Sequence, residues 1–333
     1  MLDGPVAGSP DAASLKRELG RIPLLAGMSE AQLDELEWAV RGRDMPAGEV
    51  LWRQGQEAEG MVFVSEGAVS LSMSLPGRRA VEVATARAGE VLGEVALIDG
   101  GLRTLTATVT EPTRLLTVSR ADFTTLVSRR HPTAFALKRR LAEIACARIR
   151  RQISALGDAL GEEAGGGPRR EAPEPFADLE DRRAPDSRYV RRLANFRAFD
   201  SLALWGILTA GRYAFCPAGS TLIAEGTRSP ACCLVINGAV EKVIVRGARR
   251  IRVGLAGPGH ALAYESLIDG GPSTTTAITR ERALLLLLPQ AAFARLFGDE
   301  TAGSHVFLDV ILRDLTAALR QATRPQAHLA ASR

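Results

Sequence analysis

One short stretch of the chain combines residue types that can hold a sugar phosphate: Gly93, Glu94, Val95, Ala96, Leu97, Arg103 and Thr104. A helical turn that starts near Glu94 would present the backbone N–H groups of Ala96 and Leu97 to an anion, because the first N–H groups of a helix lack partners within it. Arg103 would donate charge-assisted hydrogen bonds to the phosphate oxygens. The Glu94 carboxylate can accept a hydrogen bond from a ribose hydroxyl, and Gly93 allows close approach of the backbone. The pattern predicts a pocket for a sugar phosphate.

The chain contains two copies of the segment that carries this motif. Residues 89–109 align without gaps on residues 259–279, and ten of the twenty-one positions are identical. Turn glycines upstream repeat at a spacing of 171 residues, against 170 within the aligned segment, which a single deletion in the intervening hairpin explains. The 333 residues therefore indicate two tandem copies of one domain.

The second copy lacks the charged residues of the motif. At the positions of the glycine, the glutamate and the arginine it has Ala263, Tyr264 and Ser273, and Glu265 and Thr274 complete this degenerate site. A shift of one residue would bring Glu265 to the sugar position, but no arginine follows at the right distance. We expect the second copy to keep the fold and to bind no nucleotide. The alternative is an altered pocket for another ligand, with Tyr264 as a stacking face.

Each copy has the pattern of short strands separated by turns. In the first copy the expected strands are 49–52, 61–65, 68–74, 80–84, 104–109 and 114–119. Pro76 and Gly77 lie between two alternating runs and predict a hairpin. The predicted fold class is mainly β with flanking helices, with two tandem β-jelly-roll (double-stranded β-helix) barrels, each followed by an α-helix.

Helices are expected on both sides of each barrel. Ser29 and Gln32 fit a capping box, and residues 133–156 carry one apolar stripe at helical spacing. The opposite face of that helix is basic, and a basic helix face favours a solvated surface. Its residues are Lys138, Arg139, Arg140, Arg148, Arg150 and Arg151. A comparable apolar stripe covers residues 308–319. Each stripe can serve as a dimer seam, as a lid over a ligand, or as a packing face on its own barrel.

These features divide the chain into six parts. They are an N-terminal tail (1–21), the first domain (22–130), a C-helix or hinge (131–156), a flexible linker (157–187), the degenerate second domain (188–300), and a C-terminal helix and tail (301–333). The linker is expected to lack secondary structure because it contains a triple glycine, four prolines and nine acidic residues.

Composition excludes several classes of protein. The chain is 46% hydrophobic and 24% charged, which is typical of a globular protein, and the apolar run Leu284–Leu288 is far shorter than the roughly 20 residues of a membrane-spanning helix. The N-terminus lacks the features of a signal peptide, so we expect a cytoplasmic protein. The four cysteines are expected to be buried free thiols. The four histidines lie far apart, so we expect no metal site and no cofactor.

The motif Gly-Glu-Val-Ala-Leu-Ile-Asp-Gly-Gly-Leu-Arg-Thr, together with the turn glycines Gly48, Gly55 and Gly67, resembles the cyclic-nucleotide-binding domain. This module is shared by catabolite activator protein, by the regulatory regions of cAMP- and cGMP-dependent kinases, and by cyclic-nucleotide-gated channels. The resemblance covers roughly residues 22–156, and its most specific part is this phosphate-binding cassette.

The resemblance implies a cyclic nucleotide, cAMP or cGMP, as the ligand. Glu94 would hold the ribose 2′-hydroxyl and Arg103 the cyclic phosphate, with N–H groups donated by Ala96 and Leu97. Thr104 would lie near the base or the phosphate; a threonine here often accompanies cGMP binding, although cAMP binders accept it as well. The base preference therefore stays open.

We expect a regulatory protein and not an enzyme, because the sequence contains none of the common catalytic motifs. Nucleotide binding to the first domain would shift the helix 133–156, with Leu137, Leu141 and Ile144 as a lid, and would signal to an effector protein or a second copy of the chain. The second domain would be a docking or dimerisation module. No direct contact with nucleic acid or membrane is expected. The alternatives are a constitutive scaffold that binds no nucleotide, and a co-regulator of a separate DNA-binding protein; cyclic dinucleotides are a further ligand class.

Overall fold

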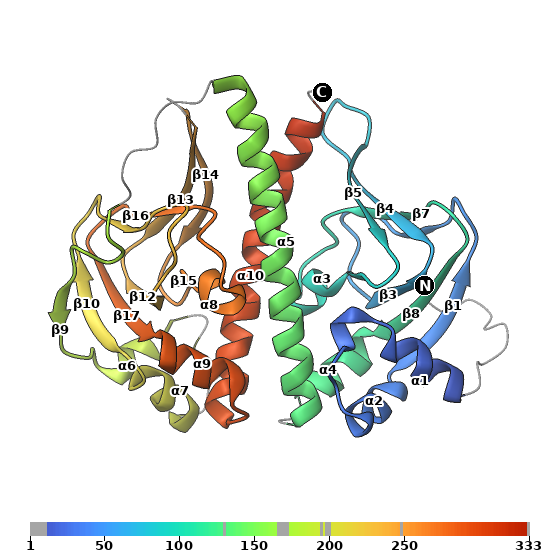
Figure 1. The fold of residues 1–333 in the computed structure, drawn as a ribbon, viewed down its shortest axis with the longest axis horizontal. Coiled ribbons are helices and arrows are strands. Elements are labelled where there is room, and N and C mark those ends of the chain that lie inside the picture. The colour runs from blue at the N-terminus through green and yellow to red at the C-terminus, as the bar shows by residue number, and fades with distance from the viewer. Residues whose placement is uncertain are drawn as a thin grey trace. The chain divides into compact units, whose positions relative to one another are not determined.

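The computed structural model describes residues 12–128, 131–164, 173–193, 196, 201–246 and 249–331. The chain divides into two units, one formed by Met1–Ile144 and Thr323–Arg333 and the other by Ala145–Ala322. Each unit contains two antiparallel sheets that enclose a hydrophobic core, with helices beside them (Figure 1). The predicted fold class, two β-sandwich domains of the jelly-roll kind with flanking helices, is confirmed.

The first unit has two four-stranded sheets, ordered β1-β8-β3-β6 and β2-β7-β4-β5. Their strands are β1 (Val40–Met45), β2 (Val50–Trp52), β3 (Gly60–Glu66), β4 (Ala68–Met73), β5 (Val81–Arg87), β6 (Val91–Leu92), β7 (Thr106–Val109) and β8 (Thr113–Ser119). The helices are α1 (Ala12–Gly20), the 3-10 turn η1 (Pro23–Leu25), α2 (Glu30–Glu37), α3 (Glu94–Ile98), α4 (Arg120–Ser128) and the beginning of α5 (Pro132–Ala164). Val62 and Leu115 from one sheet meet Trp52 and Val69 from the other in the core.

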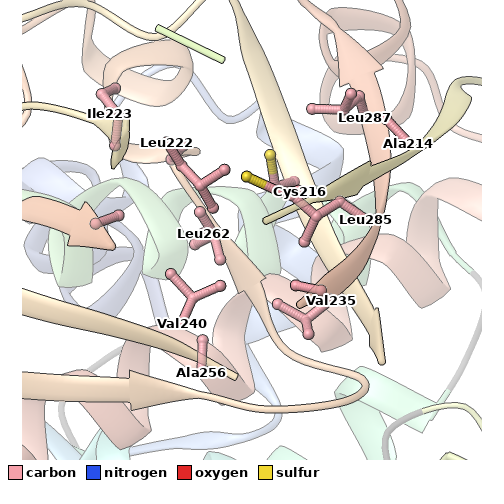
Figure 2. Close-up of a cluster of buried hydrophobic side chains, with 14 residues drawn as sticks. Ala214, Cys216, Leu222, Ile223, Val235, Val240, Ala256, Leu262, Leu285 and Leu287 are labelled. Atoms are coloured by element: carbon pink, nitrogen blue, oxygen red, sulfur yellow. The ribbon is translucent and has the colours of Figure 1, made fainter. Parts of the chain in front are cut away.

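The second unit repeats this arrangement with one additional strand. Its sheets are ordered β15-β12-β17-β10-β9 and β11-β16-β13-β14. The strands are β9 (Glu180–Arg182), β10 (Arg212–Cys216), β11 (Thr221–Ile223), β12 (Ala231–Asn237), β13 (Val240–Arg246), β14 (Arg249–Ala256), β15 (Ala261–Leu262), β16 (Thr276–Thr279) and β17 (Ala283–Pro289). The helices are α6 (Ser187–Val190), α7 (Ser201–Leu208), α8 (Glu265–Asp269), α9 (Gln290–Gly298) and α10 (Ala302–Ala330). Figure 2 shows its core, where Leu222, Val235, Leu262 and Leu285 come from different strands.

Equivalent backbone hydrogen bonds confirm the alignment of the two copies. The N–H of Gly89 donates to the carbonyl of Val64 at 2.7 Å, and the N–H of Gly259 donates to the carbonyl of Val235 at 2.7 Å. Both glycines have positive φ angles, of 92° and 87°. A turn that requires the left-handed region favours glycine, which explains why the turn glycines carried the signal of the repeat.

The two long helices each belong to both units. Helix α5 contributes residues up to Ile144 to the first unit and residues from Ala145 to the second. Helix α10 contributes residues up to Ala322 to the second unit and residues from Thr323 to the first. The helix that follows each barrel therefore contributes residues to both units. The three roles expected for the apolar stripes stay predictions.

The structure differs from the flexible linker predicted at 157–187. Helix α5 continues to Ala164, because residues 158–164 are mostly Ala, Leu and Glu, which favour helix. Strand β9 pairs with β10 at the edge of a sheet, and Phe176 and Leu179 pack against the core of the second unit. The remainder of the predicted linker, residues 165–172, lies outside the described residues.

Other expectations have mixed outcomes. The capping box is confirmed, since the Ser29 N–H donates to Gln32 Oε1 at 2.9 Å and the Gln32 N–H donates to Ser29 Oγ at 3.3 Å. The solvated basic face is wrong for two residues: Lys138 is buried, and the Arg150 side chain is only 17% exposed. The four cysteines are free and buried, as predicted. Within the described residues, no helix has both the length and the apolar character needed to cross a membrane.

Candidate functional site

The cassette of the first unit begins at a glycine whose conformation and surroundings both exclude a side chain. Strand β6 ends at Leu92, and Gly93 then adopts φ 87° and ψ −2°, in the left-handed region, before α3 begins at Glu94. A Cβ atom on Gly93 would lie 2.4 Å from Nη1 of Arg103 and 3.2 Å from the carbonyl oxygen of Gly60. The glycine therefore lets the chain turn and lets the guanidinium lie against the backbone.

Arg103 is buried beneath this turn. The residue is only 5% exposed; its Nη1 donates to the Gly93 carbonyl at 2.9 Å and its Nη2 to the Gly60 carbonyl at 2.5 Å. The guanidinium carbon lies 3.9 Å from the centroid of the Trp52 ring, a cation–π contact. The Nε atom is buried and has no hydrogen-bond partner in the structure. A buried cation with a remaining donor is suited to receive an anion.

The charge of Arg103 persists at neutral pH despite this burial. Burial lowers the pKa of Arg103 to about 10, and the nearby Arg120 lowers it further, whereas the carboxylates of Glu94 and Glu59 oppose the shift. A guanidinium with a pKa near 10 is still almost entirely protonated at pH 7. The site therefore combines a fixed positive charge with the Glu94 carboxylate.

The structure brings the predicted residues of the first motif together. Glu94 is the first residue of α3 and is only 2% exposed, Ala96 and Leu97 are also buried, and Val95 and Thr104 are half-buried. The loop that carries the arginine is held by the backbone: the Gly55 N–H donates to the Arg103 carbonyl at 2.9 Å. Whether these residues bind a ligand stays a prediction.

Two residues of this site were not predicted from the sequence. Trp52 supplies the ring against the guanidinium, and the carbonyl of Gly60 accepts one of its hydrogen bonds. Trp52 lies at the end of an expected strand, so its type and position were visible, but its partner lies fifty-one positions away. No local pattern indicates such a pairing, and a backbone carbonyl leaves no sequence signal at all.

The predicted lid residues lie on α5 in the first unit. Leu137 and Leu141 are buried core residues, each 1% exposed, and Ile144 is half-buried. The role of these three residues as a lid stays a prediction. A different segment contacts the strands near the cassette: Ala327 of α10 and Ala331 pack in a cluster with Leu105 and residues of β4, β5 and their hairpin.

The hydrogen bonds around that cluster show how the end of α10 is held in the first unit. The Gln326 side chain donates to the carbonyl of Val83 at 3.4 Å, and the Arg78 guanidinium donates to the carbonyl of Ala331 at 3.0 Å. Because Leu105 is two residues beyond Arg103, this contact reaches the immediate neighbourhood of the cassette. The sequence did not predict it, since the apolar stripe of α10 does not identify the barrel on which its last turns pack.

In the second unit, the backbone of the cassette is retained without its glycine. Ala263, at the Gly93 position, has φ 63°, in the left-handed region that non-glycine residues rarely adopt. Ser273, at the Arg103 position, uses its Oγ to donate to the carbonyl of Thr275 at 2.7 Å. The second copy has thus kept the shape of the loop and replaced its cation with a small hydroxyl.

The remaining residues of the degenerate site are engaged within the protein. The Glu265 carboxylate pairs with Nζ of Lys242 at 3.0 Å, and the two side chains are 14% and 15% exposed. Burial by itself lowers the pKa of Lys242, but the adjacent Glu265 charge outweighs burial and the net shift is upward. Tyr264 is completely buried and Thr274 is half-buried. A stacking face on Tyr264 would therefore require the structure to open, and the Glu265 carboxylate is already paired with a lysine of the chain.

In the described part of the chain, no group of three histidine, cysteine, aspartate or glutamate residues could hold a metal ion.

Comparison with known proteins finds a family model and curated relatives that match parts of this chain. The family model described as cyclic nucleotide-binding domain matches residues 43–130 and 214–300, which together are more than half of the chain. A cyclic nucleotide-gated potassium channel, mll3241, from Mesorhizobium japonicum is 37% identical over 107 residues, which are 32% of this chain and 28% of the channel. The cyclic AMP receptor protein of Thermus thermophilus is 31% identical over 125 residues, which are 36% of this chain and 58% of that protein. The chain thus spans less than two thirds of the length of these curated relatives.

Similar solved structures include two further proteins. The regulatory domain of protein kinase A from Toxoplasma gondii, crystallised with cAMP, is 18% identical with a TM-score of 0.34 over 89% of this chain and 95% of that chain. The N-terminal domain of a transcriptional regulator from Streptomyces coelicolor is 30% identical with a TM-score of 0.34 over 38% of this chain and 89% of that chain.

Proposed function

Because the chain belongs to the cyclic nucleotide-binding domain family, we propose that its first domain binds cAMP or cGMP through the cassette that contains Glu94 and Arg103. The observation that carries this proposal is the buried guanidinium of Arg103, 5% exposed, in the same cassette as the buried Glu94. A phosphate can accept from the Nε donor, which no protein group uses, in addition to the Nη groups. The Glu94 carboxylate is the acceptor for a ribose hydroxyl.

The relatives support cAMP as the first ligand to test. One is named as a cyclic AMP receptor protein and another as a cyclic nucleotide-gated channel, so nucleotide binding occurs in proteins that share this domain. The half-buried Thr104 would lie near the base or the phosphate, and a threonine here is compatible with both cAMP and cGMP. We therefore keep both nucleotides in the proposal.

The response to the nucleotide is proposed to be a helix movement that signals to a partner protein. Binding can shift the protein between two arrangements only if the nucleotide has different affinities for them. Two helices are placed to take part: α5, which carries the proposed lid, and the end of α10, which packs against Leu105. The second domain, with Ser273 at the arginine position, would act as a docking module and would bind no nucleotide.

Isothermal titration calorimetry of the full chain with cAMP, cGMP and a cyclic dinucleotide tests the proposal. We expect saturable heat with cAMP or cGMP, with one site per chain. Absence of heat with all ligands at high micromolar concentration would overturn nucleotide binding and favour a constitutive scaffold. Two sites per chain would leave the first domain as a sensor but would contradict the proposed role of the second.

A further inference from the structure

Within the second unit, one arginine of helix α5 is bound by the loop that corresponds to the end of the phosphate cassette. Nη2 of Arg150 donates to Asp269 Oδ1 at 2.7 Å and to the Gly271 carbonyl at 3.1 Å. Its Nε donates to the other carboxylate oxygen of Asp269, and its Nη1 donates to the Pro272 carbonyl. All three nitrogens of the guanidinium therefore donate to acceptors of residues 269–272 of this loop.

The loop is built to accept a guanidinium at this point. Asp269 is oriented by a hydrogen bond from the Gly271 N–H at 2.9 Å, and the nearby arginine holds the pKa of this carboxyl below its usual value although burial acts in the opposite direction. A Cβ atom on Gly271 would lie 3.0 Å from the central carbon of the Arg150 guanidinium. A glycine at this position thus leaves room for the planar group, which meets a carboxylate and two carbonyls at once.

The first copy has the same acceptor residues in its loop. The two copies therefore share these acceptors, although only the first copy has the proposed phosphate-binding arginine. Asp99 and Gly101 align with Asp269 and Gly271 at a spacing of 170 residues, and Asp99 also accepts from the Gly101 N–H at 2.9 Å. The second copy has kept the acceptor residues of this loop, and it has lost the arginine that the first copy has at position 103. The Asp269 carboxylate of its loop is paired with a cation of the chain itself, Arg150.

A second arginine, Arg246, contacts helix α5 at Gly157, two turns after Arg150. Nε of Arg246, at the end of β13, donates to the carbonyl of Gly157 at 3.2 Å, and its two Nη groups pair with both oxygens of Glu225 at 2.8 and 2.9 Å. A Cβ atom on Gly157 would lie 2.5 Å from Nη2 of Arg246. Residues 150 and 157 are seven positions apart, which places both contacts on one face of the helix.

We infer that the cassette loop of the second domain has become a binding site for helix α5, with the Arg150 guanidinium as its resident ligand. This inference deepens the proposed function, because it rests on the second domain acting as a docking module, and it identifies what is docked. The domain would then respond to the position of the helix that leaves the first domain, instead of responding to a nucleotide of its own.

Hydrogen–deuterium exchange of the full chain without nucleotide tests this inference. Arg150→Ala should raise the exchange rate of residues 265–273 roughly tenfold or more, because it removes the partner of Asp269. This increase is at the low end of the range for loss of a charge pair, since the Arg150 and Asp269 side chains are 17% and 28% exposed. Asp269→Asn should have a comparable effect, and the double variant should add little to either one because both changes remove the same contact. The matched control is Arg151→Ala, an exposed neighbour on the same helix, which should stay within about twofold of the wild type.

The outcomes that would overturn the inference are specific. Exchange in Arg150→Ala that resembles the Arg151→Ala control, or effects of the two single variants that multiply in the double variant, would show that the loop does not depend on the arginine. Should Arg150→Ala fail to fold, Arg150→Lys keeps the charge but loses the planar donor set, and exchange at wild-type level in that variant would equally overturn the inference.

A nucleotide arm separates this inference from the proposed function. In the Arg103→Ala variant, cAMP or cGMP should leave exchange at residues 265–273 unchanged at a concentration where calorimetry shows that the first site is empty. Protection there would show that the second loop takes a nucleotide and would overturn the inference. Failure of the wild type to bind nucleotide would instead overturn the proposed function and leave the exchange results without nucleotide intact.

Discussion

Replacement of Arg103 by alanine provides the sharpest test of the first site. The side chain is 5% exposed, and its charge is desolvated enough that its pKa falls to about 10. Loss of one member of a buried charge pair costs roughly 2 to 5 kcal/mol, so the dissociation constant for the cyclic nucleotide should rise by about 30-fold to several thousandfold. The strong burial places the expectation toward the upper part of this range.

The same substitution should also destabilise the unliganded domain. Arg103 donates to the carbonyls of Gly93 and Gly60, and a buried acceptor without its donor costs roughly 1 to 3 kcal/mol. Affinity must therefore be measured by calorimetry at a temperature where circular dichroism shows that the variant is folded. Arg103→Lys retains the charge but supplies a single donor centre, so its affinity should lie between those of the wild type and the alanine variant.

The matched control is Arg21→Ala, which removes an exposed arginine from the same unit and should leave both affinity and stability unchanged. The reasoning is refuted if Arg103→Ala is folded and binds nucleotide within about threefold of the wild type, because an exposed cation alone has effects of that size. An equally large loss of affinity in Arg21→Ala would show that net charge, and not the buried guanidinium, governs binding.

Four further predictions concern the two cassettes, a histidine–aspartate pair and the buried thiols. Gly93→Ala should weaken nucleotide binding, measured by calorimetry, because its Cβ would displace Arg103. Ala263→Gly should raise the free energy of unfolding slightly, measured by denaturant titration. Relief of a left-handed alanine is worth about 1 to 2 kcal/mol, which exceeds the cost of about 0.4 to 1 kcal/mol for the greater chain entropy of glycine in the unfolded state. The hydrogen bond to Asp314 raises the pKa of His260 in the folded protein. The stabilisation from this pair is therefore complete below the pKa of the unfolded state and is lost as pH rises through the pKa of the folded state. Between pH 6 and pH 8, about the ordinary range of histidine, the unfolding free energy of the wild type should fall more than that of His260→Gln, and equal slopes would contradict this. The four buried thiols, whose pKa values are raised by burial, should react with a thiol reagent only after unfolding, and rapid labelling of the native protein would contradict their placement in the core.

The sequence was most informative where a local pattern carries the physical constraint. Turn glycines such as Gly89 are required by a positive φ, and the strands alternate because one face packs on a core, so the repeat and the fold class could be predicted. The capping box at Ser29 is a contact over three residues, and it was predicted for the same reason. Short strands such as β6, with only two residues, have too little length to show a period and were missed.

Contacts between distant parts of the chain were not predictable from such patterns. The guanidinium of Arg103 lies against Trp52, and Arg150 pairs with Asp269 more than a hundred positions away. The basic face of α5 suggested only a solvated surface, because charge along a helix does not reveal which loop it meets. The end of α10, which packs against Leu105, shows the same limit for an apolar face.

The exchange of helix ends between the two units has a consequence for the order in which the protein folds during synthesis. Arg78 in the β4–β5 hairpin is bonded to Ala331, a residue 253 positions further along the chain. The first barrel can form its sheets early, but its apolar cluster around Leu75 is completed only when the last turns of α10 have left the ribosome. A nascent chain arrested inside the second barrel should therefore bind a hydrophobic dye at the first barrel and release it when synthesis resumes, since contacts of such long sequence separation form late.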